Sequence, residues 1–322
     1  MRTPHRVLEL LYERQEGFFL LEELAAAASV TRKRLETCLD ELRRRGQRLE
    51  FSPAHGVRLV RPVRLDAHLI ERALGTRRVG ANVICFDEVD STNDVAFDSS
   101  RQAHADGLVV LAESQRRGRG RQGRRWISPA GMNVLMSVLL VDPEPSGPAH
   151  DAMTIVAGVA VAEGVENACG LRCELKWPND VLVDGAKLAG VLVEIRKRGR
   201  RRCSVLGVGI NVNAAPPADQ IDPPATSLTE HLGHPVERTE VVRHVLRRLD
   251  EWLQRISAGA EEDLHAAWMS RCGMVNQRVT VACGGQSYAG RVLDVSPLEG
   301  LIICCDDGRR VHLPAGSSTL LP

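Results

Sequence analysis

The segment 118–126 of this 322-residue chain, Gly-Arg-Gly-Arg-Gln-Gly-Arg-Arg-Trp, limits the fold more than any other feature. Its three glycines have the G-x-G-x-x-G spacing of a dinucleotide-binding turn, which needs a strand before it and a helix after it. A strand is predicted before the segment, over 107–112. The residues Trp-Ile-Ser-Pro-Ala-Gly at 126–131, which start at the last position of the segment, cannot begin a regular helix. Residues 133–141 then form an apolar run typical of a buried strand. The segment therefore predicts a loop between two strands, which argues against a nicotinamide dinucleotide site.

Six arginines occupy the ten positions 116–125 and give this loop its chemistry. Such a run cannot pack in a core, because each guanidinium needs an anion or water, and its planar fork suits phosphate or carboxylate. The glycines let the backbone approach a ligand closely. The pattern indicates a lid that closes on a phosphorylated ligand, and a solvated basic hairpin loop is the alternative. The arginines are Arg116, Arg117, Arg119, Arg121, Arg124 and Arg125.

Composition narrows the class of protein. The net charge of +1 argues against a general polyanion binder, so any contact with nucleic acid must be local. The nine cysteines include no C-x-x-C pair and predict free thiols in a reducing compartment. We expect neither a signal peptide nor a run of 18 or more apolar residues that could span a bilayer. These features predict a cytoplasmic protein that does not bind membranes.

Lysine is rare in this chain: arginine supplies all but four of the 42 cationic residues. The lysine ammonium makes a compact point contact that a planar guanidinium cannot reproduce, so each lysine is a candidate for a specific contact. Lys33 belongs to a basic helix and Lys197 to a charged turn, where arginine would serve equally well. Lys176 and Lys187 lie in apolar strand surroundings, and these two are the candidate ligand contacts.

Residues 1–62 predict a winged helix-turn-helix domain, with three helices followed by a short two-stranded hairpin. Thr31 is the expected N-cap of the third helix, whose first turn carries Arg32, Lys33 and Arg34. Cations at that position oppose the helix dipole, so an external anion such as DNA phosphate is the favoured reason for them. The alternative is a helix-turn-helix unit that serves for dimerisation or packing.

The rest of the chain predicts an α+β fold with two further domains, 66–271 and 272–322. The larger domain alternates strands with helices and continues in a meander of strands over 172–213, so we expect a central mixed sheet. An amphipathic helix is expected over 151–168. Short strands and Gly-rich turns in the last domain indicate a small SH3-like barrel.

Polar residues at one helix start and in one turn are further candidates for a ligand site. Ser91, Thr92 and Asn93 open a predicted helix, where they either cap it or bind the polar head of a ligand. Asn179 and Asp180 follow a proline that ends a strand, and they either build the turn or contribute to a site. Both alternatives remain open from the residues alone.

Gly190 interrupts an otherwise apolar strand, which indicates that another backbone or a ligand approaches it closely. Lys187, three residues earlier, is expected to project beside whatever lies over Gly190. A lysine at the mouth of an apolar pocket, a mobile arginine loop and a polar helix start together suggest a reaction class. They fit an apolar carboxylic acid that is joined to a nucleotide phosphate.

Five motifs taken together closely resemble those of the biotin protein ligases. They are Asp-Ser-Thr-Asn at 90–93, the loop at 118–126, Lys-Trp-Pro-Asn-Asp at 176–180, Lys-Leu-Ala-Gly at 187–190 and Gly-Val-Gly-Ile-Asn-Val-Asn at 207–213. With the N-terminal domain, the chain resembles the bifunctional bacterial type, a biotin–[acetyl-CoA-carboxylase] ligase that is also the biotin operon repressor. The resemblance covers essentially the whole chain and implies a catalytic domain that resembles class II synthetase and lipoate ligase folds.

The resemblance implies a two-step reaction. Biotin and ATP, with Mg²⁺ as activator, give biotinyl-5′-AMP and pyrophosphate. A lysine of the biotin carboxyl carrier protein of acetyl-CoA carboxylase then attacks the mixed anhydride. Operator DNA is the second implied partner, and a homodimer is a candidate assembly. The arginine loop is expected to order over the adenylate and exclude water, because an acyl-adenylate hydrolyses readily.

The resemblance also assigns roles by position. Arg121 and Lys187 would be catalytic, offsetting negative charge as the carboxylate attacks the α-phosphate. Asp180 is a candidate Mg²⁺ ligand, and Asn211 and Trp126 are expected on the nucleotide side. The implied contacts of biotin or its adenylate are Ser91, Thr92, Asn93, Gln115, Gly118, Arg119, Gly120, Arg121, Lys187 and Gly190.

Two alternative functions stay open at this point. A biotin-sensing DNA-binding regulator with little ligase activity would bind operator DNA without modifying a carrier, and the presence of Lys187 argues against it. A lipoate or octanoate protein ligase shares the general fold. The glycine–arginine loop and the N-terminal domain argue against that second alternative.

Overall fold

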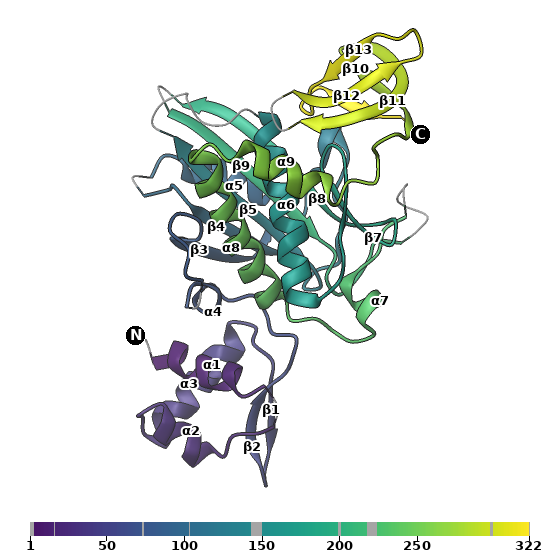
Figure 1. Ribbon diagram of the computed structural model, residues 1–322. Helices are drawn as coiled ribbons and strands as arrows, with labels where there is room; N and C mark the ends of the chain where they lie inside the picture. Colours follow the sequence, from purple (N-terminus) through teal and green to yellow (C-terminus); the bar gives the residue numbers. More distant parts are fainter. Residues whose placement is uncertain are drawn as a thin grey trace.

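The computed structural model describes residues 3–15, 17–72, 74–102, 104–142, 150–198, 201–217, 224–296 and 299–321. A seven-stranded mixed sheet lies at its centre, in the order β3-β4-β5-β9-β8-β7-β6 (Figure 1). β3 and β4 run parallel, and the other neighbouring pairs run antiparallel, so the predicted mixed sheet is confirmed. The strands are β3 (Asn82–Val89), β4 (Leu108–Gln115), β5 (Val134–Asp142), β6 (Glu174–Lys176), β7 (Asp180–Val183), β8 (Ala186–Arg198) and β9 (Arg201–Ile210).

The arginine-rich segment connects β4 to β5, which are antiparallel neighbours with Val109 opposite Val138. One turn of 3₁₀ helix, η1 (Arg121–Gly123), lies within it, and Arg119 forms an isolated bridge with Arg125. The segment is therefore a loop between two strands, as its sequence context predicts. The segment does not lead into a regular helix, so the fold contradicts a dinucleotide-binding turn at this position.

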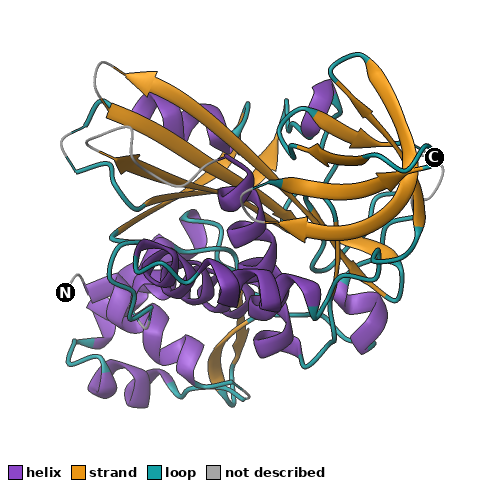
Figure 2. Cartoon of the chain, turned by 45° about the horizontal axis from the view of Figure 1, so that its top comes forward, coloured by secondary structure: helices purple, strands orange, loops and turns teal. Residues whose placement is uncertain are grey.

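Helices lie on both faces of the central sheet, and most helical residues gather on one side of it (Figure 2). α5 (Thr92–Ser99) packs on one face with Leu108 and Val110 of β4. The alternate residues Val109 and Leu111 point to the opposite face and join the larger core. That face carries α6 (His150–Cys169), α8 (Arg238–Ser257) and α9 (Glu261–Met269); the short helices are α4 (Ala67–Glu71) and α7 (Leu228–Leu232).

α6 is buried nearly all round, so the amphipathic helix predicted over 151–168 is wrong in character. Every side chain from 152 to 162 is buried, because the helix lies between the sheet and α8. By length and hydropathy Ala152–Cys169 would also pass for a membrane-spanning helix, contrary to the sequence expectation, and 72% of this window is buried inside the protein. The core of the central unit accounts for this apolar surface.

Three helices and a hairpin form the N-terminal unit, in the order that the sequence predicts. Leu35 and Leu39 of the third helix are buried, which leaves its first turn exposed. The Thr31 side chain accepts a hydrogen bond from the Arg34 backbone N–H at 3.3 Å, so the predicted N-cap is confirmed. The elements are α1 (Thr3–Glu13), α2 (Leu21–Ala27), α3 (Arg32–Arg44), β1 (Leu49–Ser52) and β2 (Gly56–Leu59).

The C-terminal unit is a five-stranded antiparallel sheet in the order β13-β12-β11-β10-β14, placed at the opposite end of the molecule from the N-terminal unit (Figure 1). His265 of α9 contacts Asp294 of this sheet at 2.7 Å, which ties it to the central unit. Its strands are β10 (Arg278–Cys283), β11 (Gln286–Ser296), β12 (Gly300–Cys305), β13 (Arg310–Leu313) and β14 (Ser318–Leu320). All nine cysteines are free, as predicted.

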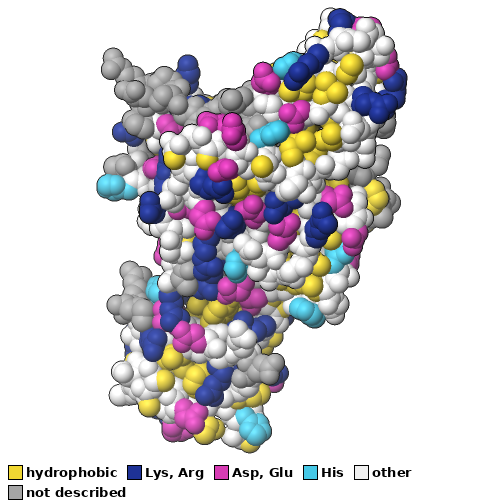
Figure 3. All heavy atoms as spheres, in the orientation of Figure 1, with side chains coloured by type: hydrophobic (Ala, Val, Ile, Leu, Met, Phe, Trp, Pro, Cys, Tyr) yellow, Lys and Arg dark blue, Asp and Glu magenta, His cyan; other side chains and the backbone are white. Residues whose placement is uncertain are grey.

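Charged side chains of both signs gather where the N-terminal unit meets the central unit (Figure 3). Glu9 of α1 is 2% exposed and contacts His68 of α4 at 2.7 Å. The Tyr12 hydroxyl donates to Glu240 of α8 at 2.7 Å, and burial beside Glu237 raises the pKa of Tyr12. Because these contacts are partly or fully buried, they hold the two units in a defined relation.

Gly164 of α6 generates a prediction about the core. A Cβ at this position would lie 2.6 Å from Val245 Cα of α8, so the two helices approach each other through the missing side chain. Alanine favours a helix by about 1 kcal/mol over glycine, but overpacking costs about 1–3 kcal/mol. We therefore expect Gly164→Ala to lower the free energy of unfolding, measured by urea denaturation.

Gly158→Ala is the matched control on the same helix. Its Cβ would meet Trp268 Cζ3 at 3.0 Å, and a side-chain edge can shift where the backbone of a helix cannot. We expect a smaller loss of stability for this variant. A Gly164→Ala protein as stable as the parent would contradict the close approach of α6 and α8.

Candidate ligand-binding site

A cavity of about 590 Å³ lies between the arginine loop, the ends of β7, β8 and β9, and strand β14. This volume is typical of a small-molecule site. Gly118 does not line it, and Thr31 to Arg34 lie in the N-terminal unit, away from the cavity. The other residues predicted for the ligand site line this cavity together: Ser91, Thr92, Asn93, Gln115, Arg119, Gly120, Arg121, Trp126, Asp180, Lys187, Gly190 and Asn211.

The start of α5 forms a buried polar floor. Ser91 occupies the N-cap position, but its side chain makes no capping hydrogen bond, so capping does not account for it. The Thr92 backbone N–H donates to Gln115 Oε1 at 2.8 Å. Asn93 Nδ2 donates to Glu194 Oε2 of β8 at 2.6 Å. These contacts fix the orientation of the floor side chains before any ligand enters.

Trp126 lies on two glycines that face each other across β8 and β9. Gly190 and Gly209 are register partners, and a Cβ on them would lie 3.0 and 2.4 Å from atoms of the indole. The close approach predicted at Gly190 is confirmed, but the group that makes it is the Trp126 side chain rather than a backbone or a ligand. The Trp126 backbone N–H donates to the Gly118 carbonyl at 3.0 Å, which closes the loop on itself.

Lys187 and Asp180 form an ion pair in the cavity wall, with 2.6 Å between Nζ and Oδ1. Backbone bonds to Pro224 and Thr226 hold Lys187 at the start of β8. Asn179 donates through Nδ2 to the Val191 carbonyl at 2.8 Å, so this side chain builds the turn. Asp180 instead faces Lys187. Of the two roles that the sequence leaves open, Asn179 therefore builds the turn, and Asp180 is placed to contribute to a site.

The arginines at the base of the loop are neutralised within the protein. Arg116 and Arg117 pair with Asp90 at 2.8 and 2.6 Å. Arg119 makes a bidentate contact with Asp94 at 2.7 and 2.8 Å, and this hydrogen bonding lowers the pKa of Asp94. The Arg119 guanidinium therefore contacts carboxylates of the protein at the edge of the cavity, and its contact with the ligand stays a prediction.

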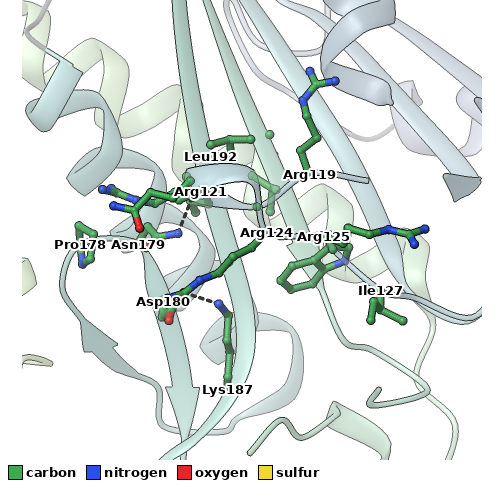
Figure 4. A pocket seen from close by; sticks show the side chains of 18 of the residues that line it. Arg119, Arg121, Arg124, Arg125, Ile127, Pro178, Asn179, Asp180, Lys187 and Leu192 are labelled. Carbon is green, nitrogen blue, oxygen red and sulfur yellow. Dashed lines mark hydrogen bonds and ion pairs between the residues drawn. The ribbon is translucent and has the colours of Figure 1, made fainter. Parts of the chain in front are cut away.

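The tip of the loop rests on the C-terminal unit. Arg121 Nη2 donates to the carbonyls of Ala315 and Ser318, the latter at 2.8 Å. Gln122 donates to Thr319. Arg124 takes a different direction: Figure 4 shows its side chain extending toward Asp180 and Lys187, while Arg119 and Arg125 point away from that pair. Among the described residues, the structure records no hydrogen bond or ion pair for the Arg124 guanidinium.

Five residues that line the cavity carry a buried polar atom without a hydrogen-bond partner, and one of these atoms, Asp180 Oδ1, is ion-paired with Lys187. The atoms are Trp126 Nε1, Trp177 Nε1, Asp180 Oδ1, Asn211 Oδ1 and Ser318 Oγ. Buried polar groups are normally satisfied, so these atoms are suited to bind a polar ligand. The described residues contain no group of three or more His, Cys, Asp or Glu side chains that could hold a metal ion. A cation carried by phosphate oxygens needs only one or two protein carboxylates, and Asp180 is the carboxylate in the cavity wall.

Comparison with known proteins places this geometry in a family. A model of the Biotin/lipoate A/B protein ligase family matches residues 85–211. The Bifunctional ligase/repressor BirA of Bacillus subtilis (strain 168) is 33% identical over 311 residues, which cover 94% of each chain. The Biotin--[acetyl-CoA-carboxylase] ligase of Mycobacterium tuberculosis is 33% identical over 79% of this chain and 96% of that protein. The chain belongs to the biotin protein ligase family.

The solved structure of the biotin protein ligase from Aquifex aeolicus in complex with biotin and ATP has the same fold. Its TM-score is 0.65 at 28% identity, and the match covers 75% of this chain and 99% of that chain. The family domain spans β3 to β9 and therefore includes both the polar floor and the Lys187–Asp180 pair. The chain is an enzyme of this family, and its cavity is the candidate active site.

Sequence reasoning singles out neither Arg124 nor the C-terminal segment 318–321, which also lines the cavity. Arg124 is one of six arginines in the loop, and only the path of the backbone distinguishes it from its neighbours. The segment Ser-Thr-Leu-Leu carries no motif or charge. Its place beside the cavity follows from the docking of the C-terminal unit, for which the sequence gives no signal.

The glycine platform under Trp126 generates a prediction. Gly209→Ala would place a methyl group where the indole lies, so we expect Trp126 to move outward. The other three tryptophans are at most 2% exposed, and acrylamide quenching therefore reports mainly on Trp126. We expect stronger quenching in Gly209→Ala, and no difference between the two backgrounds once Trp126→Phe is added.

Gly273→Ala is the control, because the nearest atom to its Cβ would be 4.0 Å away. Its quenching should equal that of the parent protein. If Gly209→Ala also behaves like the parent, then the indole does not rest on the sheet in solution.

Proposed function

We propose that this protein activates biotin with ATP to biotinyl-5′-AMP and transfers biotin to a lysine of a biotin carboxyl carrier protein. The observation that carries the proposal is one cavity that joins a polar floor to a cationic wall in a member of the biotin protein ligase family. A polar head group suits the floor, and a carboxylate with a phosphate suits the cations. Biotin and ATP supply those groups.

In the first step, a biotin carboxylate oxygen attacks the α-phosphorus, the bond from phosphorus to the bridging oxygen breaks, and pyrophosphate leaves. Negative charge grows on the oxygens around the phosphorus. Lys187 and Arg124 lie where two cations can offset that charge, and preorganised groups of this kind contribute the largest part of many rate enhancements. The sequence-based role of Arg121 stays a prediction, since its guanidinium is held by carbonyls of the C-terminal unit.

In the second step, the amine of the carrier lysine attacks the acyl carbon, the bond to AMP breaks, and the amine loses a proton to solvent. The loop that ends at Trp126 covers the cavity and would keep water from the mixed anhydride. Asn211, with its unpartnered Oδ1, is suited to the nucleotide. Mg²⁺ would enter with the phosphates and meet Asp180, which fits a metal held chiefly by its substrate.

Substitutions of Lys187 and Arg124 test this proposal. Lys187→Ala and Arg124→Ala should each slow biotin-dependent pyrophosphate release by about a hundredfold or more, because each removes a charge from the developing transition state. Arg117→Ala is the control, since its exposed side chain pairs with Asp90 outside the cavity. Equal rates in all three variants would contradict the assigned roles.

Pyrophosphate release, together with biotinylation of a carrier domain, separates the alternatives. A lipoate or octanoate ligase would release pyrophosphate with lipoate or transfer octanoate, and would ignore biotin. A biotin-sensing regulator would bind biotin and DNA but would leave the carrier domain unmodified. Biotinylation of a carrier domain in the presence of ATP and Mg²⁺ contradicts both.

We propose DNA binding as a second function, carried by the exposed start of α3. Arg32 pairs with Glu22 and with Glu36, the latter at 3.3 Å. Lys33 and Arg34 are exposed, and the structure records no ion pair for either among the described residues. Two unpaired cations at the start of a helix in a three-helix, two-strand unit are suited to contact DNA phosphates, as in a winged helix-turn-helix. Biotin-responsive repression and a homodimer stay predictions.

Salt dependence tests the DNA proposal. Lys33→Ala and Arg34→Ala should each weaken binding to a short DNA duplex and reduce the slope of log affinity against log salt by about 1, as expected for one lost phosphate contact. Arg309→Ala, in the C-terminal unit, should leave both quantities unchanged. Binding that is insensitive to the two α3 variants would show that this helix does not face DNA.

A further inference from the structure

We propose that Glu194 is a positioning residue that sets the direction of the hydrogen bonds at the cavity floor and thereby the recognition of the biotin head group. Glu194 lies on β8 behind the floor and is not among the residues that line the cavity. The inference rests on the proposed function, because it takes biotin as the ligand. Glu194 would act through Asn93, Ser137 and Thr92 rather than by contact with the ligand.

A chain of three short contacts connects Glu194 to the Thr92 hydroxyl at the floor. Asn93 Nδ2 donates to Glu194 Oε2 at 2.6 Å. Ser137 Oγ lies 2.6 Å from Asn93 Oδ1 and 2.6 Å from Thr92 Oγ1. Thr92, Asn93 and Ser137 are at most 4% exposed, so bulk water cannot replace a missing proton in this chain.

The number of available protons determines which group donates in each hydrogen bond of this series. An ionised carboxylate only accepts, so Glu194 forces the Asn93 amide to present its oxygen to Ser137. The single Ser137 proton is then used on Asn93. Two hydroxyl oxygens 2.6 Å apart need a proton between them, so Thr92 must donate to Ser137.

The ligand therefore meets a defined set of partners. The Thr92 hydroxyl has given its proton to Ser137, so the longer contact of 3.1 Å between Thr92 Oγ1 and Gln115 Oε1 carries no proton. Thr92 Oγ1 therefore offers a lone pair to an N–H donor. Gln115 Oε1 accepts the Thr92 backbone N–H at 2.8 Å, which leaves the amide N–H groups of Gln115 to donate. The ureido ring of biotin carries two N–H donors and one carbonyl acceptor, which this set complements. The dithiolane ring of lipoate carries neither.

The arginine loop completes the surroundings of the carboxylate. Arg119 Nη2 lies 3.2 Å from Glu194 Oε2, and Arg196 lies 3.5 Å from its other oxygen. These guanidinium groups balance the negative charge at a partly buried position. Arg119, which lines the cavity, thus also contributes to recognition through Glu194, and its other partner Asp94 is not part of the chain of hydrogen bonds.

Substitutions along the chain test the proposal in the pyrophosphate-release assay with biotin and ATP. Glutamine at position 194 can donate as well as accept, so Glu194→Gln allows the chain to reverse, and Ser137→Ala interrupts it. We expect each to raise the KM for biotin about five- to tenfold, the effect of one hydrogen bond. The KM for ATP and kcat should stay within about twofold, because these steps do not use the chain.

Three further variants separate direction from simple packing. The double variant Glu194→Gln/Ser137→Ala should be no worse than either single variant, because both act in one chain. Glu194→Asp keeps an acceptor-only group and should retain most of the biotin affinity. Asp94→Asn removes the other carboxylate that holds Arg119 and should change the KM for biotin by less than about twofold.

The outcomes separate this inference from the proposed function. If the unmodified protein releases no pyrophosphate with biotin, both the proposed function and the inference about Glu194 are contradicted. If it is active and Glu194→Gln and Ser137→Ala match it, this inference alone is overturned. Additive effects in the double variant, or an equal effect of Asp94→Asn, would also overturn it, since Glu194 would then act by packing or by anchoring the loop.

Discussion

The contact between Trp126 and the paired glycines of β8 and β9 is the constraint on which the site depends. An indole can lie flat on a sheet only where both strands lack side chains, and Gly190 and Gly209 provide this at one register position. The contact pins the end of a loop that would otherwise be a basic hairpin in solvent. The remaining neighbours of the cavity, including Lys187, are arranged around this pinned tryptophan, whose ring centroid lies 5.8 Å from Nζ.

The loop concentrates positive charge, yet most of that charge is matched by the fold. Asp90 and Asp94 near the start of α5 receive three of the six guanidinium groups. Exposed ion pairs of this kind contribute little to stability, so their effect is mainly to orient the loop. The cations turned toward Asp180 are Arg124 and Lys187. A long run of like charges is thereby reduced to a small number of cations at the place where an anion is expected.

The sequence identifies the elements of the site better than their partners. Strand and helix order and the loop between β4 and β5 follow from periodicity, whereas the convergence of Ser91, Lys187 and Asn211 is implied by the resemblance to the biotin protein ligases. The orientation of Arg119 could not be predicted, because its partners Asp94 and Glu194 lie on a helix and a strand that only tertiary packing brings together. The amphipathic character predicted for α6 is wrong for a related reason: a helix that is covered on both sides needs no polar face.

A buried ion pair connects the N-terminal unit to both ends of the arginine loop. Arg238 binds Glu113 of β4 at 2.6 and 3.2 Å and also donates to the carbonyl of Asn133, which precedes β5. Glu113 accepts the Leu65 backbone N–H at 3.0 Å, and Arg238 donates to the Val63 carbonyl at 3.4 Å, so the segment 63–65 between β2 and α4 is bound to the same pair. Leaving one partner of a buried pair alone costs about 3–5 kcal/mol. A movement of residues 63–65 that broke the pair would be opposed by that energy, so the segment that follows the N-terminal unit is held beside both strands that flank the arginine loop.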